Sequence, residues 1–235
     1  MKDVSLEALA KCIDISCVKS ADSTEDMDQM IAAARRFGFI CAFSLPAMTP
    51  YLINHLKGTG ITRIGGTVGF PSGCDTTKSK VFQAKELIAM GCEEIDMVIN
   101  IGFLKSNMWD EVYEDIKAVA NVCGQIPLKT ILEVSLLTEE EIVRASQLAE
   151  SAGASYIKTG TGWCQNPTRL QHIQSIRSAI KPTTKIKAAG GIRSLDTLLQ
   201  MKQSGCDRFG ISTASALSIM KEAAAYEDIS RFFPN

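Results

Sequence analysis

The segment LKTILEVSLLTEEEIVRASQLAESAGASYIK, from Leu128 to Lys158, has the pattern of a strand, a helix and a second strand. Its two ends, 128–134 and 155–158, are short, apolar and rich in β-branched residues, as buried parallel strands are. Between them, Thr138 precedes three glutamates, which is typical of a capped helix start, and apolar residues then recur at helical spacing. Gly153 follows, where a left-handed helix end uses glycine. The segment is therefore predicted to form one βαβ unit.

The same alternation of strand-like and helix-like segments runs through the whole chain. Eight short apolar segments begin at intervals of 23 to 33 residues, and stretches with helical spacing lie between them. The segments are 13–18, 39–43, 63–68, 95–100, 128–134, 155–158, 185–188 and 208–211. Eight alternating strands and helices predict an α/β fold, a single (β/α)8 TIM barrel, which takes roughly 250 residues. We therefore expect residues 1–235 to form one domain.

An open, doubly wound sheet is the alternative architecture. Such sheets usually have fewer strands, and their dinucleotide fingerprint G-x-G-x-x-G follows none of the eight segments. The chain shows no linker, low-complexity run or break in composition that would divide it. The barrel is the preferred prediction.

The composition narrows the class of protein. Of 235 residues, 46% are apolar and 22% are charged, and the formal net charge is −1, values that are typical of a globular chain. The apolar runs are far shorter than a membrane span, and no basic patch suggests nucleic acid or an anionic membrane as partner. Residues 1–7 lack the apolar core of a secretory signal. We expect a cytoplasmic protein.

Eight cysteines and two histidines bear on metals and disulfides. No two cysteines are separated by two residues, and the histidines, His55 and His172, have no cluster of acids beside them. These patterns favour buried free thiols in a reducing compartment, and they argue against a histidine-rich metal site. We expect no metal and no other cofactor.

Barrel enzymes place their functional residues at the carboxyl ends of the strands. Lys158 and Lys187 each close an apolar strand there, and Asp96 lies on another strand. Two neighbouring, poorly solvated lysines lower each other's pKa, and a neutral amine can attack a carbonyl to form a Schiff base. An acid with the second lysine could then move protons. The alternative is that each lysine caps a helix or pairs with an acid.

Glycine and hydroxyl residues mark the last two strands. Gly190-Gly191 and Gly210 with Ser212-Thr213 precede helices, and Arg193 adds a positive charge nearby. Backbone N–H groups at helix starts bind anions, and barrels often hold a phosphate after strands seven and eight. The alternative is that tight strand-to-helix turns need glycine for the backbone alone. The two segments together favour a phosphate site.

Five motifs stand out in the sequence: VGFPSG at 68–73, EEIDMVINIG at 93–102, LEVSLLT at 132–138, YIKTGTGW at 156–163 and IKAAGGIR at 186–193. Together they resemble the deoxyribose-phosphate aldolase family, and the resemblance covers residues 13–216. Members of this family are metal-free class I aldolases built on a (β/α)8 barrel. They cleave 2-deoxy-D-ribose 5-phosphate to acetaldehyde and D-glyceraldehyde 3-phosphate, in carbohydrate catabolism.

The resemblance also implies a role for each matching residue. Lys158 would be the Schiff-base nucleophile, Lys187 the neighbour that lowers its pKa, and Asp96 the acid of the proton relay. Other residues would bind substrate or phosphate. They are Gly162, Gly190, Gly191, Gly210, Ser212 and Thr213 in the phosphate loops, with Asp14, Ser16, Cys41 and Lys129 in support. The partners would be a phosphorylated sugar and a short aldehyde, and class I barrels of this type often form homodimers.

The chain departs from the family pattern at a few positions. Gly160 and Ala189 stand where the family has serines, Ile15 stands where it has histidine, and Ala42-Phe43 replaces Val-Asn after Cys41. We expect these changes to remove polar groups from the substrate path and to make the pocket more apolar. Two alternatives stay open: a related Schiff-base aldolase for another phosphorylated sugar or keto compound, and a non-catalytic sugar-phosphate binding protein. Residues 226–235 are expected to form a helix and a tail, without the family's terminal tyrosine.

Overall fold

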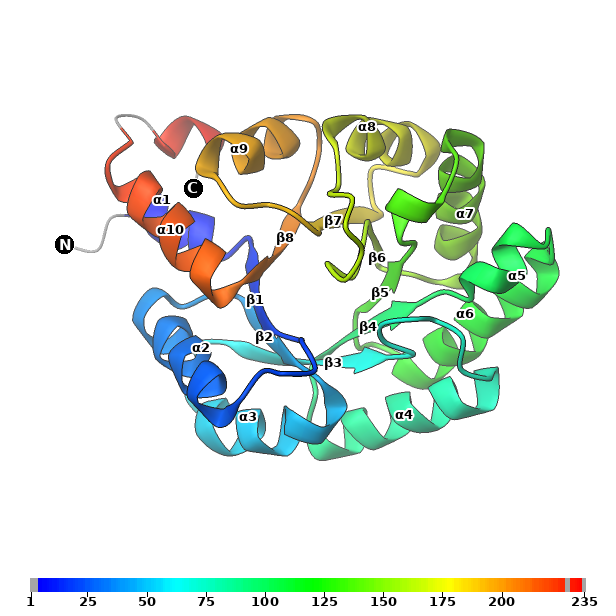
Figure 1. Cartoon of the computed structure of the whole chain (residues 1–235), viewed down its shortest axis with the longest axis horizontal. Helices are drawn as coiled ribbons and strands as arrows, with labels where there is room; N and C mark the ends of the chain where they lie inside the picture. Colours follow the sequence, from blue (N-terminus) through cyan, green and yellow to red (C-terminus); the bar gives the residue numbers. More distant parts are fainter. Residues whose placement is uncertain (1–3, 227–228, 234–235) are drawn as a thin grey trace.

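Eight parallel strands close into a barrel that is surrounded by helices (Figure 1). The computed structural model describes residues 4–226 and 229–233. Each strand pairs with the next along the chain, and β8 pairs with β1. The strands are β1 Ile13–Cys17, β2 Cys41–Ser44, β3 Arg63–Val68, β4 Glu94–Val98, β5 Leu128–Ile131, β6 Tyr156–Lys158, β7 Lys185–Ala189 and β8 Arg208–Ser212. The predicted (β/α)8 barrel is confirmed, and the open sheet is excluded because this sheet closes on itself.

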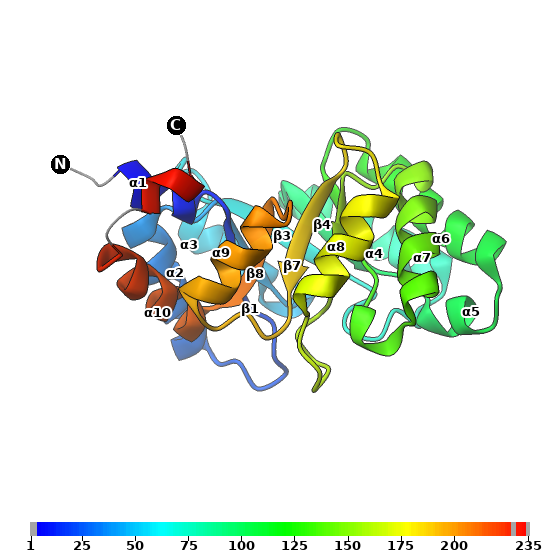
Figure 2. The same ribbon diagram turned by 90° about the horizontal axis from the view of Figure 1, so that it is seen from above.

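The helices lie outside the strands in both ribbon views (Figure 1, Figure 2). They are α1 Val4–Ala10, α2 Thr24–Phe37, α3 Thr49–Leu56, α4 Thr77–Met90, α5 Ile101–Lys105, α6 Trp109–Cys123, α7 Glu139–Ala152, α8 Leu170–Ala179, α9 Leu195–Gln203 and α10 Thr213–Ala224. Three short 3₁₀ helices, Pro46–Met48, Val134–Leu136 and Ile229–Phe232, complete the described elements. Within the described parts of the chain, no helix is long and apolar enough to cross a bilayer.

The predicted strands are all present, and their ends differ for local reasons. The segment 63–68 is strand throughout, as predicted. The segment 128–134 stops being strand at Ile131, because Glu133 adopts a left-handed backbone (φ 56°) and starts a 3₁₀ turn. The segment 95–100 ends at Val98, because Asn100 caps α5 with its side chain. Capping and turn geometry therefore set the ends of the strands.

The helix ends follow the sequence signals closely. Ser23 and Thr138 each form a capping box with the acid three residues on, which satisfies backbone N–H groups at the starts of α2 and α7. Gly38, Gly91 and Gly153 end α2, α4 and α7 in the left-handed conformation that glycine adopts most readily. Capping side chains therefore mark the starts of α2 and α7, and glycines mark the ends of α2, α4 and α7.

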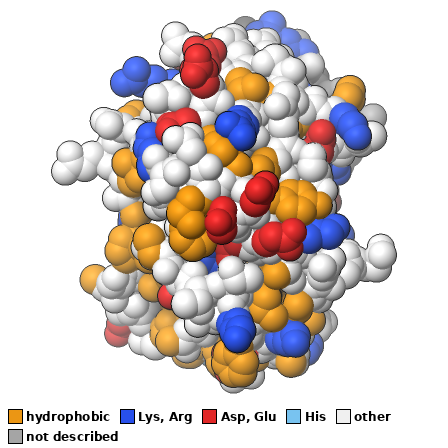
Figure 3. Space-filling view, turned by 90° about the vertical axis from the view of Figure 1, so that its right-hand side faces the viewer, with side chains coloured by type: hydrophobic (Ala, Val, Ile, Leu, Met, Phe, Trp, Pro, Cys, Tyr) orange, Lys and Arg blue, Asp and Glu red, His pale blue; other side chains and the backbone are white. Residues whose placement is uncertain are grey.

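The apolar core lies between the barrel and its helices, and α1 packs against α10 and the 3₁₀ helix Ile229–Phe232. The expected C-terminal helix is this short 3₁₀ turn, and Asn235 lies outside the described residues. Figure 3 shows the side of the molecule on which α5, α6 and α7 lie, with acidic, basic and apolar side chains interspersed. That mixed face agrees with the near-zero net charge of the sequence.

Inside the barrel, one aromatic ring lies against two lysines. The Phe43 ring centroid is 4.1 Å from the Lys187 Nζ and 4.5 Å from the Lys129 Nζ. A cation over an aromatic face is electrostatically favourable, particularly away from water. The ring has room only because the neighbouring residue on β3 is Gly65, where a Cβ would lie 2.1 Å from the ring. Gly65 thus makes space for the ring beneath the charged residues.

We expect Gly65→Ala to lower the free energy of unfolding by about 1–3 kcal/mol, because the added methyl group overpacks a full interior. Urea denaturation measures the change. Gly102→Ala is the matched control, because the nearest atom to a Cβ at that position on α5 lies 3.4 Å away. Equal stability of the two variants would contradict the close packing of Gly65 against Phe43.

Candidate functional site

A cavity of about 350 Å³ opens among the loops that follow the strands. Its floor is formed by buried charged side chains, which include Lys158, Lys187 and Asp96. Its rim is formed by the loops after β6, β7 and β8. All of the predicted phosphate-loop residues line the cavity: Gly162, Gly190, Gly191, Gly210, Ser212 and Thr213. Asp14 and Ser16 line it as well, whereas Cys41 and Lys129 do not.

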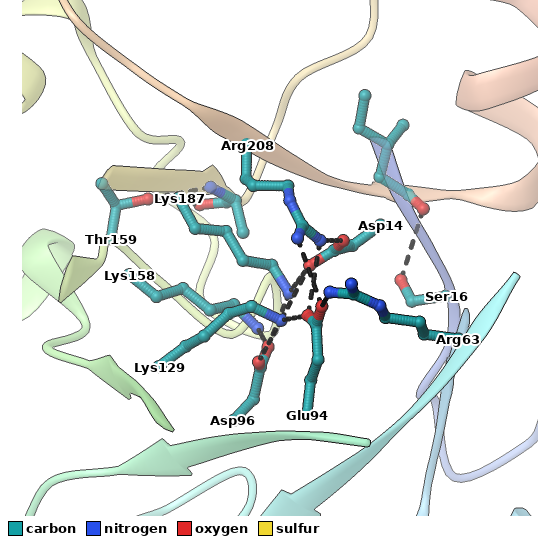
Figure 4. A network of polar contacts seen from close by, with 12 residues as sticks. Asp14, Ser16, Arg63, Glu94, Asp96, Lys129, Lys158, Thr159, Lys187 and Arg208 are labelled. Carbon is teal, nitrogen blue, oxygen red and sulfur yellow. Dashed lines mark hydrogen bonds and ion pairs between the residues drawn. The ribbon is translucent and has the colours of Figure 1, made fainter. Parts of the chain in front are cut away.

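The two predicted lysines meet on one carboxylate (Figure 4). Lys158 and Lys187 are register partners on β6 and β7, so their side chains enter the barrel side by side. Asp96 Oδ2 accepts a hydrogen bond from the Lys158 Nζ at 2.8 Å and one from the Lys187 Nζ at 2.6 Å. All three side chains are buried. The alternative that each lysine pairs with an acid is correct as geometry, but both lysines share the same acid.

Lys129 and Arg208 add further ion pairs to this group of charges. Lys129 contacts Asp96 Oδ1 at 3.3 Å and Asp14 Oδ2 at 3.1 Å, and it donates a hydrogen bond to Glu94. Arg208 joins the same group through Asp14 and Glu94. These charges are packed so closely that changing one alters the electrostatic potential at all the others.

The charges in this network do not balance. Lys129, Lys158, Lys187 and Arg208 are four buried basic groups, and Asp14, Glu94 and Asp96 are three buried acidic groups. A fourth positive charge without a carboxylate is costly in a buried site. The excess positive charge therefore makes one of the four bases easier to deprotonate, and the amine of a lysine loses its proton far more readily than an arginine does.

Lys158 is the base that loses its proton most easily. Burial lowers the pKa of its ammonium to about 8, the positive charge of Lys187 lowers it further, and Asp96 opposes both. About a tenth of Lys158 side chains are then neutral at pH 7. In Lys129, burial acts in the same direction, but the carboxylates of Asp14 and Asp96 hold the pKa well above its ordinary value. The neutral amine therefore lies at Lys158, on the cavity floor.

Asp96 is ionised in the resting site. Burial alone would raise the pKa of its carboxyl group, but the three lysines around it hold the pKa well below its usual range. The carboxylate is consequently a fixed acceptor that orients both lysines. Its negative charge also stabilises any positive charge that forms on the Lys158 nitrogen.

The rim offers hydrogen-bond donors to an anion. Ser212 is the N-cap of α10, yet its side chain makes no capping bond and instead lies 3.2 Å from the Ser215 hydroxyl. The first N–H groups of α10 are thus left for a ligand. Thr213 Oγ1 is buried without a hydrogen-bond partner within residues 4–226 and 229–233. The predicted anion site is physically sensible, and the turns also need their glycines, since Gly190 and Gly191 have positive φ.

One set of side chains has the donor types of a metal site. Atoms of Asp14, Cys41 and Glu94 lie within 4.8 Å of one another. Both carboxylates are already ion-paired with Lys129 and Arg208, and burial raises the pKa of the Cys41 thiol well above its ordinary value. Cationic side chains and a protonated thiol do not suit a metal ion. The donor set therefore serves the charge network.

Sequence reasoning missed Glu94, Arg208 and Glu133. The signal for the first two was available, because Glu94 lies two residues before Asp96 on the same strand and hence on the same inner face. Arg208 likewise lies two residues before Gly210 on β8. Glu133 gave no comparable signal, because its importance depends on Thr161, which follows another strand.

The expectation that Gly160 reshapes the substrate path is wrong. Gly160 does not line the cavity, and a Cβ at that position would lie 2.7 Å from the Glu133 Oε1. The other oxygen of Glu133 accepts hydrogen bonds from the backbone N–H and the hydroxyl of Thr161. Ile15 is also outside the cavity, buried in the core. Among the departures from the family pattern, Ala189 and Phe43 line the cavity.

The family model and the sequence relatives point to one family. Residues 10–213 match the family model described as DeoC/LacD family aldolase. The chain is 42% identical over 217 residues to a deoxyribose-phosphate aldolase from Sinorhizobium medicae, covering 92% of this chain and 88% of that protein. It is 37% identical to the deoxyribose-phosphate aldolase of Klebsiella pneumoniae, covering 91% of this chain and 86% of that protein.

Solved structures show the same likeness. The aldolase QR15 superposes with a TM-score of 0.86 at 31% identity, covering 96% of this chain and 97% of that one. The tetrameric deoxyribose phosphate aldolase from Aeropyrum pernix superposes with a TM-score of 0.85 at 25% identity, covering 94% and 92% of the two chains. The barrel, including the strands that carry the buried charges, is therefore shared.

The rate at which Lys158 is reductively trapped by acetaldehyde and cyanoborohydride should rise with pH and reach half its maximum near pH 8. The reason is that the neutral amine forms as the pH passes through the lowered pKa of Lys158, which is about 8. Lys187→Met should move this midpoint to higher pH, because it removes a positive charge that lowers the pKa. Peptide mass mapping locates the adduct. Lys185→Met is the control on the same strand, and an equal shift in that variant would contradict the assignment.

Gly160→Ser should lower the free energy of unfolding by about 1–3 kcal/mol, because its Cβ meets a buried carboxylate. The midpoint of urea denaturation reports the loss. Gly102→Ser makes the same chemical change on α5, where the nearest atom lies 3.4 Å from the Cβ, and should be nearly neutral. If Gly160→Ser were as stable as the parent protein, Glu133 would not be held as the structure places it.

Proposed function

This chain belongs to the DeoC/LacD aldolase family, and we propose that it is a class I deoxyribose-phosphate aldolase. In this proposal it cleaves 2-deoxy-D-ribose 5-phosphate to acetaldehyde and D-glyceraldehyde 3-phosphate, and forms it from them, through a Schiff base on Lys158. The observation that carries the proposal is the excess buried base. Lys158 has a pKa lowered to about 8 by burial and by Lys187, and it lies on the floor of a cavity whose rim suits a phosphate.

The proposed reaction begins with the neutral Lys158 amine. Its nitrogen lone pair attacks the carbonyl carbon of acetaldehyde to give a carbinolamine. The carbinolamine hydroxyl then takes up a proton and leaves as water, and an iminium ion remains. This ion restores the fourth positive charge of the buried network beside the Asp96 carboxylate, which lies 2.8 Å from the Lys158 Nζ. The negative charge of Asp96 stabilises the iminium ion because it is already oriented and shielded from water.

Proton transfer then makes the nucleophile. The methyl group next to the iminium carbon loses a proton, and the electron pair of that C–H bond forms the enamine. In the proposal, a bound water held by the Lys187 ammonium takes this proton and passes it to the carboxylate of Asp96, the acid of the relay. Asp96 also holds Lys187 in place by the 2.6 Å hydrogen bond that it accepts from the Lys187 Nζ.

Carbon–carbon bond formation follows. The enamine carbon attacks the aldehyde carbon of D-glyceraldehyde 3-phosphate, the aldehyde oxygen takes up a proton, and an iminium ion forms again at Lys158. Water adds to this ion, and the sugar leaves as the Lys158 amine is released. The rim glycines, with Ser212 and Thr213, would hold the phosphate and so align the acceptor aldehyde.

Several broader properties remain proposals. We propose that residues 1–235 act as one domain in the cytoplasm, without a metal or other cofactor, in carbohydrate catabolism. The cysteines described by the structure are free thiols, which suits a reducing compartment. The proposed catalytic groups all come from one barrel, so a homodimer would not need to share a site. A relative from Aeropyrum pernix is tetrameric, so larger assemblies occur on this fold.

The deciding experiment combines borohydride trapping with 2-deoxyribose 5-phosphate and a coupled assay for glyceraldehyde 3-phosphate. We expect an adduct on Lys158 together with turnover. Lys158→Arg should abolish the adduct and lower kcat/KM by at least about 10³-fold, since the covalent route is lost. Asp96→Asn should lower it by roughly 10²–10⁴-fold.

Lys185→Arg is the control, because Lys185 lies on the same strand as Lys187 but is exposed. It should keep full activity. An adduct on Lys158 without release of glyceraldehyde 3-phosphate would indicate a related aldolase for another sugar or keto compound. The absence of any adduct with this sugar and with acetaldehyde would overturn the Schiff-base mechanism and favour a binding protein.

A further inference from the structure

A lysine outside the charge network lies at the rim of the cavity. Lys19 belongs to the loop between β1 and α2, is exposed, and lines the cavity. Its Nζ donates a hydrogen bond to the carbonyl oxygen of Gly162 at 2.6 Å, across 143 residues of sequence. The Lys19 side chain therefore crosses the mouth of the barrel and places its positive charge against the loop that follows β6.

This position is next to the glycine loops of the rim. A Cβ built on Gly162 would lie 3.8 Å from the Gly190 Cα, so the loops after β6 and β7 are in direct contact. The Lys19 ammonium, bound to Gly162, therefore lies beside the backbone that is proposed to receive the phosphate. Among the residues that line the cavity, Lys158 and Lys187 are bound to Asp96 on the floor. The other two basic residues that line the cavity, Lys19 and Arg193, lie on its rim.

An aromatic side chain holds Lys19 in this place. The Trp163 ring centroid lies 5.1 Å from the Lys19 Nζ, and the Trp163 Nε1 donates a hydrogen bond to the Val18 carbonyl oxygen at 2.8 Å. The Trp163 ring also packs against the Phe70 ring in a T-shaped arrangement, with the two ring centroids 6.1 Å apart. Trp163 is 38% exposed, an unusual amount for so large an apolar side chain, and this interaction with the β1–α2 loop gives it a role.

The carboxylates that line this part of the cavity are already engaged. The Asp22 Oδ2 accepts a hydrogen bond from the Lys19 backbone N–H at 2.7 Å, and Asp26 is held in the capping box of Ser23. Within the described residues, the Lys19 Nζ has no carboxylate oxygen within the 4.0 Å of an ion pair. An ammonium carries three N–H donors, so the bond to Gly162 leaves donors for a ligand.

We propose that Lys19 binds the phosphate group of the substrate, and that Trp163 is its positioning residue. The proposal rests on the proposed function, since it names the residue that selects phosphorylated sugars at that site. The rim otherwise offers mainly neutral donors, from glycine N–H groups and hydroxyls. A doubly charged phosphate gains most from a nearby cation in a site partly shielded from water. Lys19 therefore separates phosphorylated from unphosphorylated substrates.

The test compares cleavage of 2-deoxyribose 5-phosphate and of unphosphorylated 2-deoxyribose. In Lys19→Met, the KM for the phosphorylated sugar should rise about 10- to 100-fold, the range expected for loss of a charged hydrogen bond. Its kcat should stay within about two-fold, and kcat/KM for 2-deoxyribose should not change. Lys19→Arg should restore most of the affinity, and Trp163→Ala should raise the same KM by a smaller factor.

Lys11→Met is the matched control. Lys11 is also exposed, and its Nζ also donates to a backbone carbonyl, that of Ile61, but it does not line the cavity. This variant should leave both substrates unaffected. If Lys19→Met lowered kcat/KM equally for both sugars, Lys19 would only tie two loops together, and the proposal would be overturned. An unchanged kcat/KM for both sugars would overturn it as well.

A second measurement does not depend on turnover. Inorganic phosphate should bind the parent protein, as measured by calorimetry, and Lys19→Met should weaken its Kd by about 10-fold or more, again as a charged hydrogen bond is lost. Unchanged phosphate binding in Lys19→Met would overturn the inference. If the parent enzyme binds phosphate through Lys19 but cleaves neither sugar, the proposed function fails and this inference stands.

Discussion

One carboxylate oxygen organises the centre of this barrel. The Asp96 Oδ2 accepts hydrogen bonds from both Lys158 and Lys187, in an interior where all three side chains are buried. Burial penalises each charge, so the positions of the remaining groups are constrained by the need to pair them. Glu94 and Arg208 extend the pairing toward the opposite end of the barrel. Three buried carboxylates then face four buried bases, and burial together with this shortage of negative charge makes a neutral amine accessible at Lys158.

The cavity divides this chemistry between its floor and its rim. The floor holds charges in fixed pairs and leaves one amine ready to form a covalent bond. The rim is built from glycine loops and hydroxyl groups, to which Lys19 brings a positive charge from the far side of the mouth. Separating the two regions keeps a phosphate dianion away from the Lys158 ammonium, whose pKa it would otherwise raise. A substrate with one reactive carbonyl and one phosphate fits both regions.

The sequence predicted the strands and helices more completely than it predicted which residues line the cavity. Lys158, Lys187 and Asp96 were placed together because strand ends of a barrel meet at one face, a rule that needs no coordinates. Gly160 was misjudged, because a sequence motif says which residues are neighbours along the chain and not which way a side chain would point. Its Cβ position faces Glu133 instead of the cavity. Arg208 was missed although it lies on an inner face, since its partners come from β1 and β4.

The sequence by itself determined the eightfold alternation of strands and helices, their capped ends and the lysines that close two neighbouring strands. These are local properties, set by hydrophobic period, capping side chains and backbone freedom over a few residues. Only the tertiary structure decided which charges pair, which amine is neutral, and that Lys19 reaches Gly162. Those outcomes depend on distances between groups far apart in the chain, and on a burial that exists only once the barrel closes.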